Sequence, residues 1–396
     1  MTSRFSFEFD VVVAGGGPAG STAATLLALH GHKVLLIERS QHPRFHIGES
    51  MLPHSESIVH RLGIDWGKGN LHKGGAEFVD EEKEKSIYFP LSDKYKTYQI
   101  ERSGFDMLLF ENAADKGVET HQREKVIRVE SAISPVVVET DKTAYRCRYF
   151  IDATGRSALM GRGLRSIKRL ENLGRFALYS HYRNVTTPAA DSLFETGNVV
   201  VLTVDIGWIW VIPLIGRRLS IGLVIQNQGV RSNAGLFQRY IGQSRLLQRV
   251  LSGAEQENAI RAEADFSFVN RGRHGQRYAT CGDASGFLDP VFSSGVFLAF
   301  TSAERIADRL HEALVGEFED DPCLHCVDDE RYESGFRTMQ LIVERFYQSD
   351  LVSNLFFEAD RDERIKREVG KILAGDLWSE SNAFQKGLLE GRRARV

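Results

Sequence analysis

Apolar and polar positions follow different patterns along this chain, and each pattern predicts a different element. Near the N-terminus, Phe9–Ala14 is a continuous apolar run that ends in glycine, which predicts a short buried strand. The Ala- and Leu-rich stretch Ser21–His30 predicts a helix that Gly31 ends, and Lys33–Glu38 predicts a second buried strand. A strand, a helix and a strand in this order form a right-handed parallel βαβ unit.

The middle of the chain has another pattern. Between residues 176 and 226 apolar and polar residues alternate, which predicts several antiparallel strands. Buried-strand and helix patterns return at Arg277–Gly282 and Gly295–Leu310. Beyond about Glu317 the chain is charged and mainly helical, with apolar helical spacing over Gln340–Phe357. Two more elements of the first unit are predicted, a helix and a strand, at Phe105–Lys116 and Tyr149–Gly155.

These patterns predict an α/β fold in three parts. A discontinuous first domain with a parallel sheet takes residues 1–175 and 270–316. An antiparallel-sheet domain, residues 176–269, is inserted into it, and residues 317–396 form a helical C-terminal segment.

Composition narrows the classes of function. The net charge is −3, from 50 Lys and Arg against 53 Asp and Glu, so no basic excess favours nucleic acid. No apolar run approaches the ~18 residues of a membrane-spanning helix. The first ten residues lack the basic start of a secretory signal, and four cysteines make no disulfide framework for 396 residues. We therefore expect a cytoplasmic protein that does not bind nucleic acid and does not span a membrane.

Cysteine and histidine spacings do not predict a metal site. Cys323 and Cys326 have CxxC spacing, but no second CxxC or paired histidine motif completes a zinc site. The acidic stretch Glu317–Asp321 precedes them where a thioredoxin-like site would have a strand, so we expect ordinary cysteines in an irregular segment. Four histidines lie near the predicted site, and we expect none of them to form a metal site: His42, His46, His54 and His72.

A glycine-rich turn joins the first strand to the first helix. Gly15, Gly17 and Gly20 stand in GxGxxG register, which gives a tight turn, close approach to a pyrophosphate and close helix packing. A pyrophosphate is favoured there by the free N–H groups and the dipole of the helix. Glu38 ends the next strand, 18 residues after Gly20, and suits a ribose 2′-hydroxyl. The sequence therefore predicts a dinucleotide site at this turn.

Two later strands end in an aspartate beside glycine, at Asp152–Gly155 and Cys281–Ala284. A carboxylate in such a turn can bind ribityl hydroxyls while the chain passes close to a flavin. With the motif Glu101–Asp106, these segments resemble the aromatic-hydroxylase branch of flavoproteins, typified by para-hydroxybenzoate hydroxylase. The resemblance implies a Rossmann-like, glutathione-reductase-like FAD-binding domain in which Arg102 and Asp283 contact FAD. It implies a structural role for Asp152, within its own turn.

Further segments resemble the flavin-dependent halogenases of the phenol and pyrrole type. Gly207–Pro213 (GWIWVIP) matches their WxWxIP pattern, and Phe287–Gly295 (FLDPVFSSG) matches their FxxPxxSxG pattern. His46–Pro53 resembles a stretch shared with related reductases, and Lys73 stands where these halogenases carry a catalytic lysine. Together the motifs imply a set of cofactor-binding residues: Gly15, Gly17, Ala19, Gly20, Glu38, Arg39, Arg102, Asp283, Pro290 and Gly295.

The halogenase resemblance implies that two steps take place at separate positions in the enzyme. Hypohalous acid forms beside reduced FAD and reaches a substrate held away from it, with Trp208 and Trp210 as the barrier. Their spacing of two puts both indoles on one face of a strand. Lys73 holds or activates the acid, as a hydrogen-bond donor or a transient haloamine, and Ser293 opens an anion nest for the halide. Core packing of the tryptophans, a solvated surface lysine and an ordinary serine cap remain alternatives.

The resemblance also implies partners and co-substrates. FAD is reduced by a separate flavin reductase, since the chain has one nucleotide fingerprint, and oxygen with chloride or bromide completes the reaction. The substrate is a small electron-rich aromatic, a phenol or pyrrole, free or tethered to an acyl carrier protein. The chain is shorter than the tryptophan halogenases and has no identifiable counterpart of their glutamate partner. We therefore do not expect free tryptophan as the substrate. An aromatic monooxygenase, a geranylgeranyl-type reductase and a redox-sensing FAD protein remain alternatives.

Overall fold

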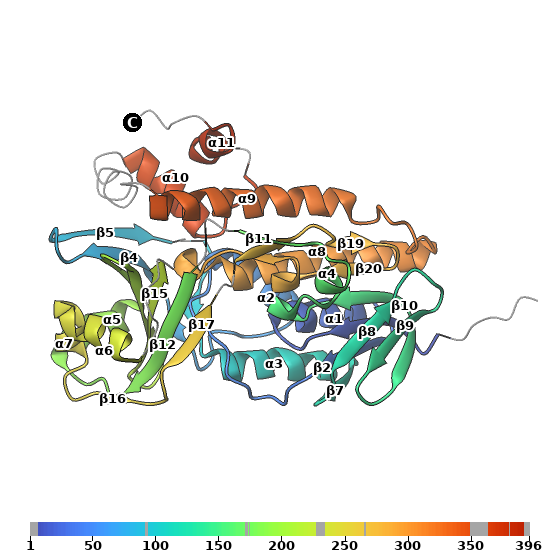
Figure 1. Cartoon of the computed structure of the whole chain (residues 1–396), viewed down its shortest axis with the longest axis horizontal. Helices are drawn as coiled ribbons and strands as arrows, with labels where there is room; N and C mark the ends of the chain where they lie inside the picture. Colours follow the sequence, from blue (N-terminus) through green and yellow to red (C-terminus); the bar gives the residue numbers. More distant parts are fainter. Residues whose placement is uncertain are drawn as a thin grey trace, which may run out of the picture.

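The computed structural model describes residues 7–91, 94–170, 173, 175–226, 234–264, 267–348, 363–379 and 381–391. The molecule is elongated, with a mainly parallel sheet toward one end, an antiparallel sheet toward the other, and α9 running along the top above α8 (Figure 1). Its helices are α1 Pro18–Leu29, α2 Glu56–Arg61, α3 Arg102–Asp115, α4 Leu159–Gly163, α5 Asp191–Thr196, α6 Ala234–Gln243, α7 Arg245–Val250, α8 Ser294–Gly316, α9 Cys326–Gln348, α10 Glu363–Leu373 and α11 Ala383–Leu389.

The first sheet is formed by strands from two separate stretches of the chain, residues 9–152 and 274–280. Its strands are β1 Phe9–Ala14, β2 Val34–Glu38, β7 Glu119–Gln122, β8 Val126–Glu130, β9 Val136–Thr140, β10 Ala144–Asp152, β19 His274–Gly275 and β20 Tyr278–Thr280. The order is β19–β20–β10–β1–β2–β7, and the pairs from β20 to β7 are parallel. The predicted βαβ unit is confirmed, because β1 pairs with β2 in parallel through the helix α1.

Two layers cover this sheet. In β1, Val11 and Val13 pack with α1, α3 and α8 in one core, whereas Val12 and Ala14 pack with residues of β8 and β9 in another. Side chains alternate between the faces of a strand, so this division follows from the strand itself. Because both faces are buried, β1 and β2 read as continuous apolar runs in the sequence.

The second sheet contains the strands predicted from the alternating pattern. Its members are β4 Gly75–Asp80, β5 Lys85–Pro90, β12 Arg175–Arg183, β13 Val199–Val204, β14 Gly207–Leu214, β15 Arg218–Gln226, β16 Glu255–Gln256 and β17 Arg261–Ala264. The order is β16–β12–β15–β14–β13–β4–β5, with β17 also on β12. The pairs from β12 to β13 are antiparallel, as predicted. One face packs against α5, α6 and α7, and the other against α8, α9 and α10.

The remaining strands are short. They are β3 Leu71–His72, β6 Tyr98–Gln99, β11 Ile167–Arg169, β18 Phe268–Asn270 and β21 Gly286–Phe287. β3 pairs with β6, and β11, β18 and β21 form a three-stranded sheet.

The predicted α/β fold class is confirmed, and the division at residues 175, 269 and 316 stays a proposal. One feature qualifies that division: β4 and β5 precede residue 176 but join the second sheet, where β4 pairs with β13. The pairing buries Phe78, Ile87 and Phe89 against the second sheet's core. The C-terminal part contains α9, α10 and α11, and the predicted Gln340–Phe357 helix beyond Gln348 lies outside the described residues.

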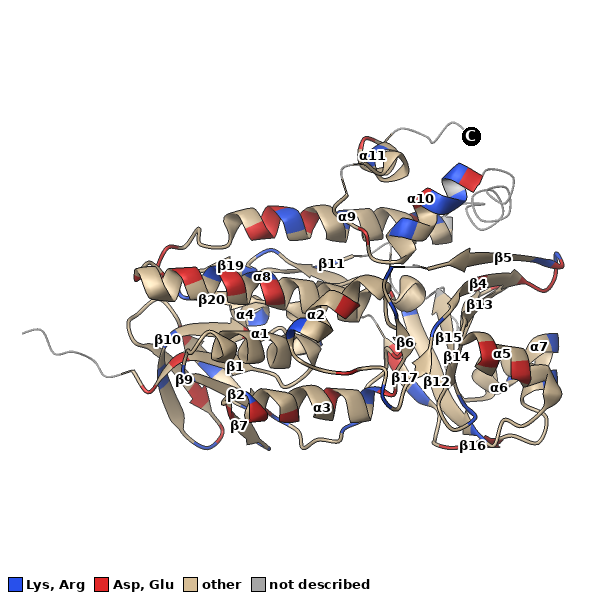
Figure 2. Ribbon diagram, turned by 180° about the vertical axis from the view of Figure 1, so that it is seen from behind, with Lys and Arg blue, Asp and Glu red and all other residues tan. Residues whose placement is uncertain are grey.

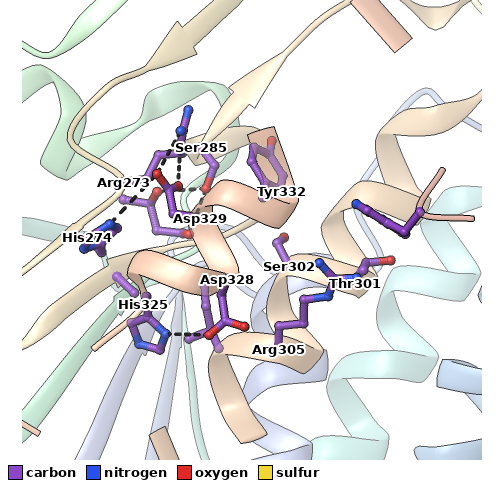
Figure 3. A pocket seen from close by; sticks show the side chains of 14 residues that line it. Arg273, His274, Ser285, Thr301, Ser302, Arg305, His325, Asp328, Asp329 and Tyr332 are labelled. Carbon is purple, nitrogen blue, oxygen red and sulfur yellow. Dashed lines mark hydrogen bonds and ion pairs between the residues drawn. The ribbon is translucent and has the colours of Figure 1, made fainter. Parts of the chain in front are cut away.

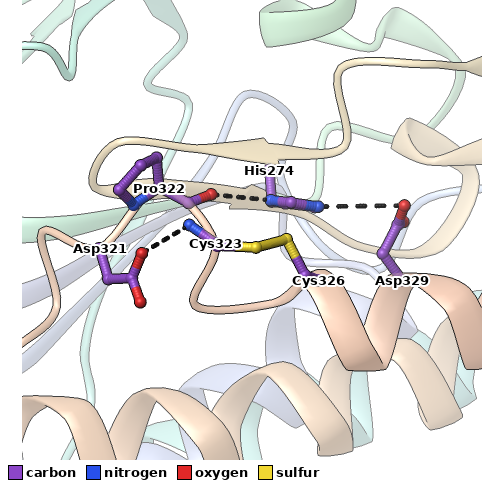
Figure 4. Close-up of a disulfide and its surroundings, with 6 residues drawn as sticks. All are labelled: His274, Asp321, Pro322, Cys323, Cys326 and Asp329. Carbon is purple, nitrogen blue, oxygen red and sulfur yellow. Dashed lines mark hydrogen bonds and ion pairs between the residues drawn. A yellow bond between two sulfur atoms is a disulfide. The ribbon is translucent and has the colours of Figure 1, made fainter.

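Cys323 and Cys326 are joined by a disulfide in the turn that leads into α9 (Figure 4). The expectation of ordinary cysteines in an irregular segment is therefore wrong in that the two cysteines are bonded to each other. The turn brings the two Cα atoms to 5.0 Å, within the range a disulfide needs, and CxxC spacing alone does not reveal that geometry. Cys147 and Cys281 are buried and unpaired.

Charged residues are distributed over the surface helices. Figure 2 shows acidic and basic residues interspersed along α8 and α9. Within the described residues, the structure contains no helix that is both long and apolar enough to cross a bilayer. Nor do the described His, Cys, Asp and Glu side chains gather in any group suited to a metal ion.

Candidate active site

The glycine turn after β1 has the close contacts that a dinucleotide turn requires. Gly15 has φ +107°, and a Cβ there would lie 2.2 Å from the carbonyl oxygen of Ala153. A Cβ at Gly20 would lie 1.8 Å from the carbonyl oxygen of Gly15, so only glycine lets α1 approach the turn. At Gly17 the nearest atom is 3.4 Å away, on Arg44, which leaves room for a ligand's approach to the backbone.

Glu38 lies beside this turn at the end of β2. Its side chain is buried, with one oxygen accepting from the Gly16 N–H at 2.7 Å and the other from the Ser40 N–H at 2.8 Å. The carboxylate is thus oriented where the sequence predicts a ribose contact. Arg39, by contrast, is exposed and donates to Ser157 Oγ at 3.1 Å.

Arg102 is buried at the start of α3 and holds two segments together. Its guanidinium donates to both carboxylate oxygens of Asp106, at 2.8 and 3.1 Å, and to the carbonyls of Ile47 and Gly48. It therefore fixes the backbone of the HIGES stretch. Burial opposes a charged guanidinium, but the Asp106 carboxylate outweighs burial and raises the pKa of Arg102.

A small pocket brings together several predicted residues at the start of α8. Asp283, Asp289, Ser294 and Gly295 line it. The dinucleotide turn is adjacent, because the nearest neighbour of a Cβ at Gly282 would be Ala19, at 2.8 Å. Burial raises the pKa of Asp283 to about 6, against the charges of Arg156 and Arg102. Burial also raises the pKa of Asp289 to about 6, so both carboxyls take up protons near pH 6.

The earlier aspartate, Asp152, serves its own turn. It is buried, and its oxygens accept from the backbone N–H groups of Thr154 and Met160 at 3.0 and 2.8 Å. This agrees with the turn-forming role that the resemblance implies for it.

Ser293 precedes α8 but does not cap it with its side chain. The residue has φ +57°, and its side chain makes no hydrogen bond to the first turn of the helix. Pro290 begins a short 3₁₀ turn in which the Asp289 side chain accepts from the Val291 N–H. Ser293 therefore does not act as an ordinary N-cap of the 23-residue helix α8.

Lys73 is buried between β3 and β4, with 3% of its side chain exposed. Its Nζ donates to the carbonyl of Met51 at 2.9 Å, and its backbone N–H donates to the carbonyl of Thr97. Burial lowers the pKa of Lys73 to about 7, so the amine gains and loses its proton near neutrality. The alternative of a solvated surface lysine is wrong for this residue, although Lys68 nearby is exposed.

The two tryptophans lie on the same face of β14, as their spacing predicts. Their rings are 6.0 Å apart, and Trp208 and Trp210 are 1% and 5% exposed. Trp208 Nε1 donates to the Tyr347 hydroxyl at 2.6 Å, and that hydroxyl donates to Asp289 Oδ2 at 2.9 Å. A hydrogen-bonded chain thus connects the WxWxIP strand to the carboxyl beside the α8 pocket.

The sequence motifs did not single out Tyr347. The guanidinium of Arg175 lies over its ring, 3.9 Å from the centroid. No local motif marks Tyr347, because its contacts come from β12, β14 and the FLDP segment. Lys73 shares none of these described hydrogen bonds; its own side chain bonds the Met51 carbonyl.

A buried ion pair between Glu49 and His181 was also not predicted. His181 Nε2 lies 2.9 and 3.1 Å from the two oxygens of Glu49, and the residues are 3% and 1% exposed. The pair joins the HIGES stretch to β12 of the second sheet. Burial alone would lower the pKa of His181, but the hydrogen bond and charge of Glu49 outweigh burial and raise it.

This pair predicts a pH-dependent stability. A histidine whose pKa is raised in the folded state stabilises it fully below the unfolded value of about 6.5, and this stability is lost as pH rises through the folded pKa. His181→Gln should therefore reduce the free energy of unfolding by about 3–5 kcal/mol at pH 6 and by less at pH 9. Urea unfolding at the two pH values measures the difference.

Arg183→Gln is the matched control on the same strand. Arg183 and Glu255 form an exposed pair at 2.9 Å, worth about 0–1 kcal/mol, without a histidine to titrate. An equal loss of stability for His181→Gln at both pH values would contradict the assigned direction of the His181 pKa.

The turn, the sheet and the Glu38 contact define an oxidoreductase that binds FAD. The sequence model of the family described as FAD dependent oxidoreductase matches residues 10–163, which include the turn and Arg102. Tryptophan 2-halogenase of Chondromyces crocatus is 32% identical over 373 residues, or 88% of this chain and 69% of that protein. The chain belongs to the flavin-dependent halogenases, enzymes that use FAD with oxygen and halide.

Other relatives agree with this family. The 1H-pyrrole-2-carbonyl-(peptidyl-carrier protein) chlorinase of Pseudomonas fluorescens is 25% identical, over 94% of this chain and 90% of that protein. The solved structure of the myxobacterial chondrochloren halogenase CndH superposes with a TM-score of 0.78 at 28% identity, and covers 96% of this chain and 92% of that one.

Proposed function

We propose that this halogenase works as one half of a two-component system and halogenates an electron-rich aromatic ring, a phenol or a pyrrole. The observation that carries the proposal is the buried Lys73, whose side chain is held at the carbonyl of Met51 with a pKa of about 7. A buried amine that exchanges its proton near neutrality suits the handling of hypohalous acid in either protonation state.

The residues present fit FAD. Gly15 and Gly20 have no space for a side chain, Gly17 leaves its backbone open to a pyrophosphate, and Glu38 is oriented beside the turn. Gly17 and the start of α1 would hold the pyrophosphate, and Glu38 the ribose. Arg102 would act on the cofactor mainly through the Ile47 and Gly48 backbone that it fixes. Reduced FAD, when bound, would supply two electrons that bring oxygen to the oxidation level of peroxide, and oxygen at that level can oxidise the halide to hypohalous acid with release of water.

The start of α8 would hold the halide. Ser294 and Gly295 line the small pocket, and the Ser293 side chain does not occupy the N–H groups of the first turn. Such groups and the helix dipole favour an anion. Asp283 and Asp289 share the pocket, and protonation near pH 6 removes the negative charge that would repel a halide.

The tryptophans would keep the substrate away from the flavin. Trp208 is fixed by its hydrogen bond to Tyr347, and Trp210 by its bond to Ser220 Oγ at 3.1 Å. Indoles held in this way would keep the aromatic ring from the flavin, and hypohalous acid formed beside the flavin would act on the ring through Lys73.

The relatives guide the choice of substrates to test. One is named for tryptophan and another for a pyrrole on a carrier protein. We propose a phenol or pyrrole, with a carrier-tethered pyrrole as the first acylated candidate, and we place the reaction in the cytoplasm.

The proposal predicts that the chain does not supply its own electrons. With NADH or NADPH alone, product should form very slowly, because one GxGxxG turn serves FAD and the sequence shows no second fingerprint. Adding an unrelated flavin reductase with FAD should restore product formation, as should chemically reduced FAD. Rapid NADPH oxidation by this chain alone, stimulated by an aromatic substrate, would instead identify a monooxygenase.

A further inference from the structure

A second cavity lies between α8 and the segment that enters α9. It shares no lining residue with the pocket at the start of α8. Figure 3 shows side chains that line it: Arg305 from α8, His325 from the turn before α9, and Asp328 and Tyr332 from α9 itself. None of these residues belongs to the FAD or halogenase motifs of the sequence.

Three of these side chains bring polar atoms that lack hydrogen-bond partners among the described residues. The atoms are Arg305 Nη1, His325 Nε2 and Tyr332 Oη. His325 and Tyr332 are 3% and 7% exposed, so bulk water does not readily serve them. A buried polar atom without a hydrogen-bond partner costs about 1–3 kcal/mol. Three such atoms, from three different parts of the chain, line this one cavity, which indicates that a ligand binds there.

The charges at the cavity favour an anion. The neighbouring Arg273 is already engaged, because its Nη2 donates to Asp329 at 2.9 Å and pairs with Glu333. Arg305 instead lies over the ring of Trp378, 4.4 Å from its centroid, and no ion pair is found for it among the described residues. Its guanidinium therefore presents a positive charge that is stacked but not neutralised.

The geometry of His325 supports the same ligand. Asp328 Oδ2 lies 3.5 Å from Nδ1, on the other side of the imidazole from Nε2. Burial lowers the pKa of His325, and the Asp328 carboxylate only partly opposes this. A bound anion at Nε2 would add a second charge that favours the imidazolium, which donates from both nitrogens. The hydroxyl of Tyr332 adds another donor, and its stem is fixed by stacking on Phe336, with ring centroids 5.7 Å apart.

We propose that this cavity is a binding site for a small monovalent anion, held by Arg305, His325 and Tyr332. A halide and a small carboxylate share the required chemistry, since each is a compact acceptor of hydrogen bonds with one negative charge. The site rests on its own contacts and not on the proposed halogenation, so it can be tested on flavin-free protein.

The test combines two anions with two variants. Wild-type protein is titrated with bromide or formate at constant ionic strength, and the unfolding temperature is followed. Crystals grown in bromide are examined by anomalous scattering. We expect a bromide peak within hydrogen-bonding distance of Arg305 Nη1 and Tyr332 Oη, and a saturable rise in unfolding temperature. Arg305→Gln should lose the peak and weaken the apparent affinity at least about 10-fold.

Tyr332→Phe removes only the hydroxyl and tests the site even where Arg305→Gln fails to fold. Arg309→Gln is the control, because Arg309 is on the same helix and pairs with Glu312 at 3.0 Å outside the cavity. Stabilisation by bromide alone would identify a halide site, and stabilisation by both anions a general small-anion site. The absence of bromide from the cavity, or equal affinity in wild type, Arg305→Gln and Tyr332→Phe, would overturn the proposal.

Discussion

Lys73→Met should lower the yield of halogenated product by about 100-fold or more, while oxygen continues to reoxidise the reduced flavin. The amine is the group that would meet hypohalous acid, and methionine fills a similar buried volume without it. The Met51 carbonyl loses one hydrogen bond, a cost of about 1 kcal/mol that a folded protein of this size tolerates. Product is quantified by mass spectrometry, and flavin reoxidation by absorbance.

Lys68→Met is the control for this experiment, because Lys68 is an exposed lysine five residues away. Both variants must first show the wild-type flavin spectrum. The pH profile then separates the two roles of the amine: activity that rises through about pH 7 requires the neutral amine, and activity that falls requires the ammonium. A Lys73→Met enzyme that halogenates at the wild-type rate and position would show that another group transfers the halogen.

Gly20→Ala should prevent normal FAD binding. The added Cβ would lie 1.8 Å from the Gly15 carbonyl, a backbone atom that cannot move aside as a flexible side chain can. Strain of about 1–3 kcal/mol or more forces α1 away from the turn, which weakens FAD binding about 10- to 100-fold. Reconstitution with FAD, followed by absorbance of the bound flavin, measures the loss.

Gly242→Ala is the matched control. This glycine is in α6, and a Cβ there meets nothing within 4 Å, so alanine should leave FAD binding unchanged and favour the helix slightly. Circular dichroism must show that Gly20→Ala remains folded. Wild-type FAD affinity in folded Gly20→Ala would mean that the cofactor does not depend on this turn.

The hydrophobic pattern and the glycine spacing predicted the elements that short stretches of sequence determine. The strands β1 and β2 read as buried because both of their faces are covered, and the glycines between them have roles that their spacing alone specifies. The alternation over residues 176–226 predicted the antiparallel strands because successive side chains of a strand point to opposite faces of its sheet. The participation of β4 and β5 was missed, since β4 pairs with β13, more than 100 residues away in the sequence, and β5 joins the sheet through β4.

The site was predictable where a motif is short and continuous. Lys73 was assigned from resemblance. Its buried position was not predictable, because its hydrogen bonds go to the carbonyls of Met51 and Thr97, more than 20 residues away in the sequence. The contacts of Tyr347 and the pair of Glu49 with His181 were missed because each partner comes from a distant strand or helix. Long-range contacts of this kind become visible only when the fold brings the elements together.

The central claim is that this chain transfers halogen, and not oxygen, to an aromatic ring. The direct measurement is mass spectrometry of phenols, pyrroles and tryptophan, free and carrier-bound, after incubation with reduced FAD, oxygen and bromide. The account predicts a brominated product, recognised by the near-equal doublet of the two bromine isotopes and absent when bromide is omitted. A product that gains one oxygen atom at the same rate with or without halide would contradict it.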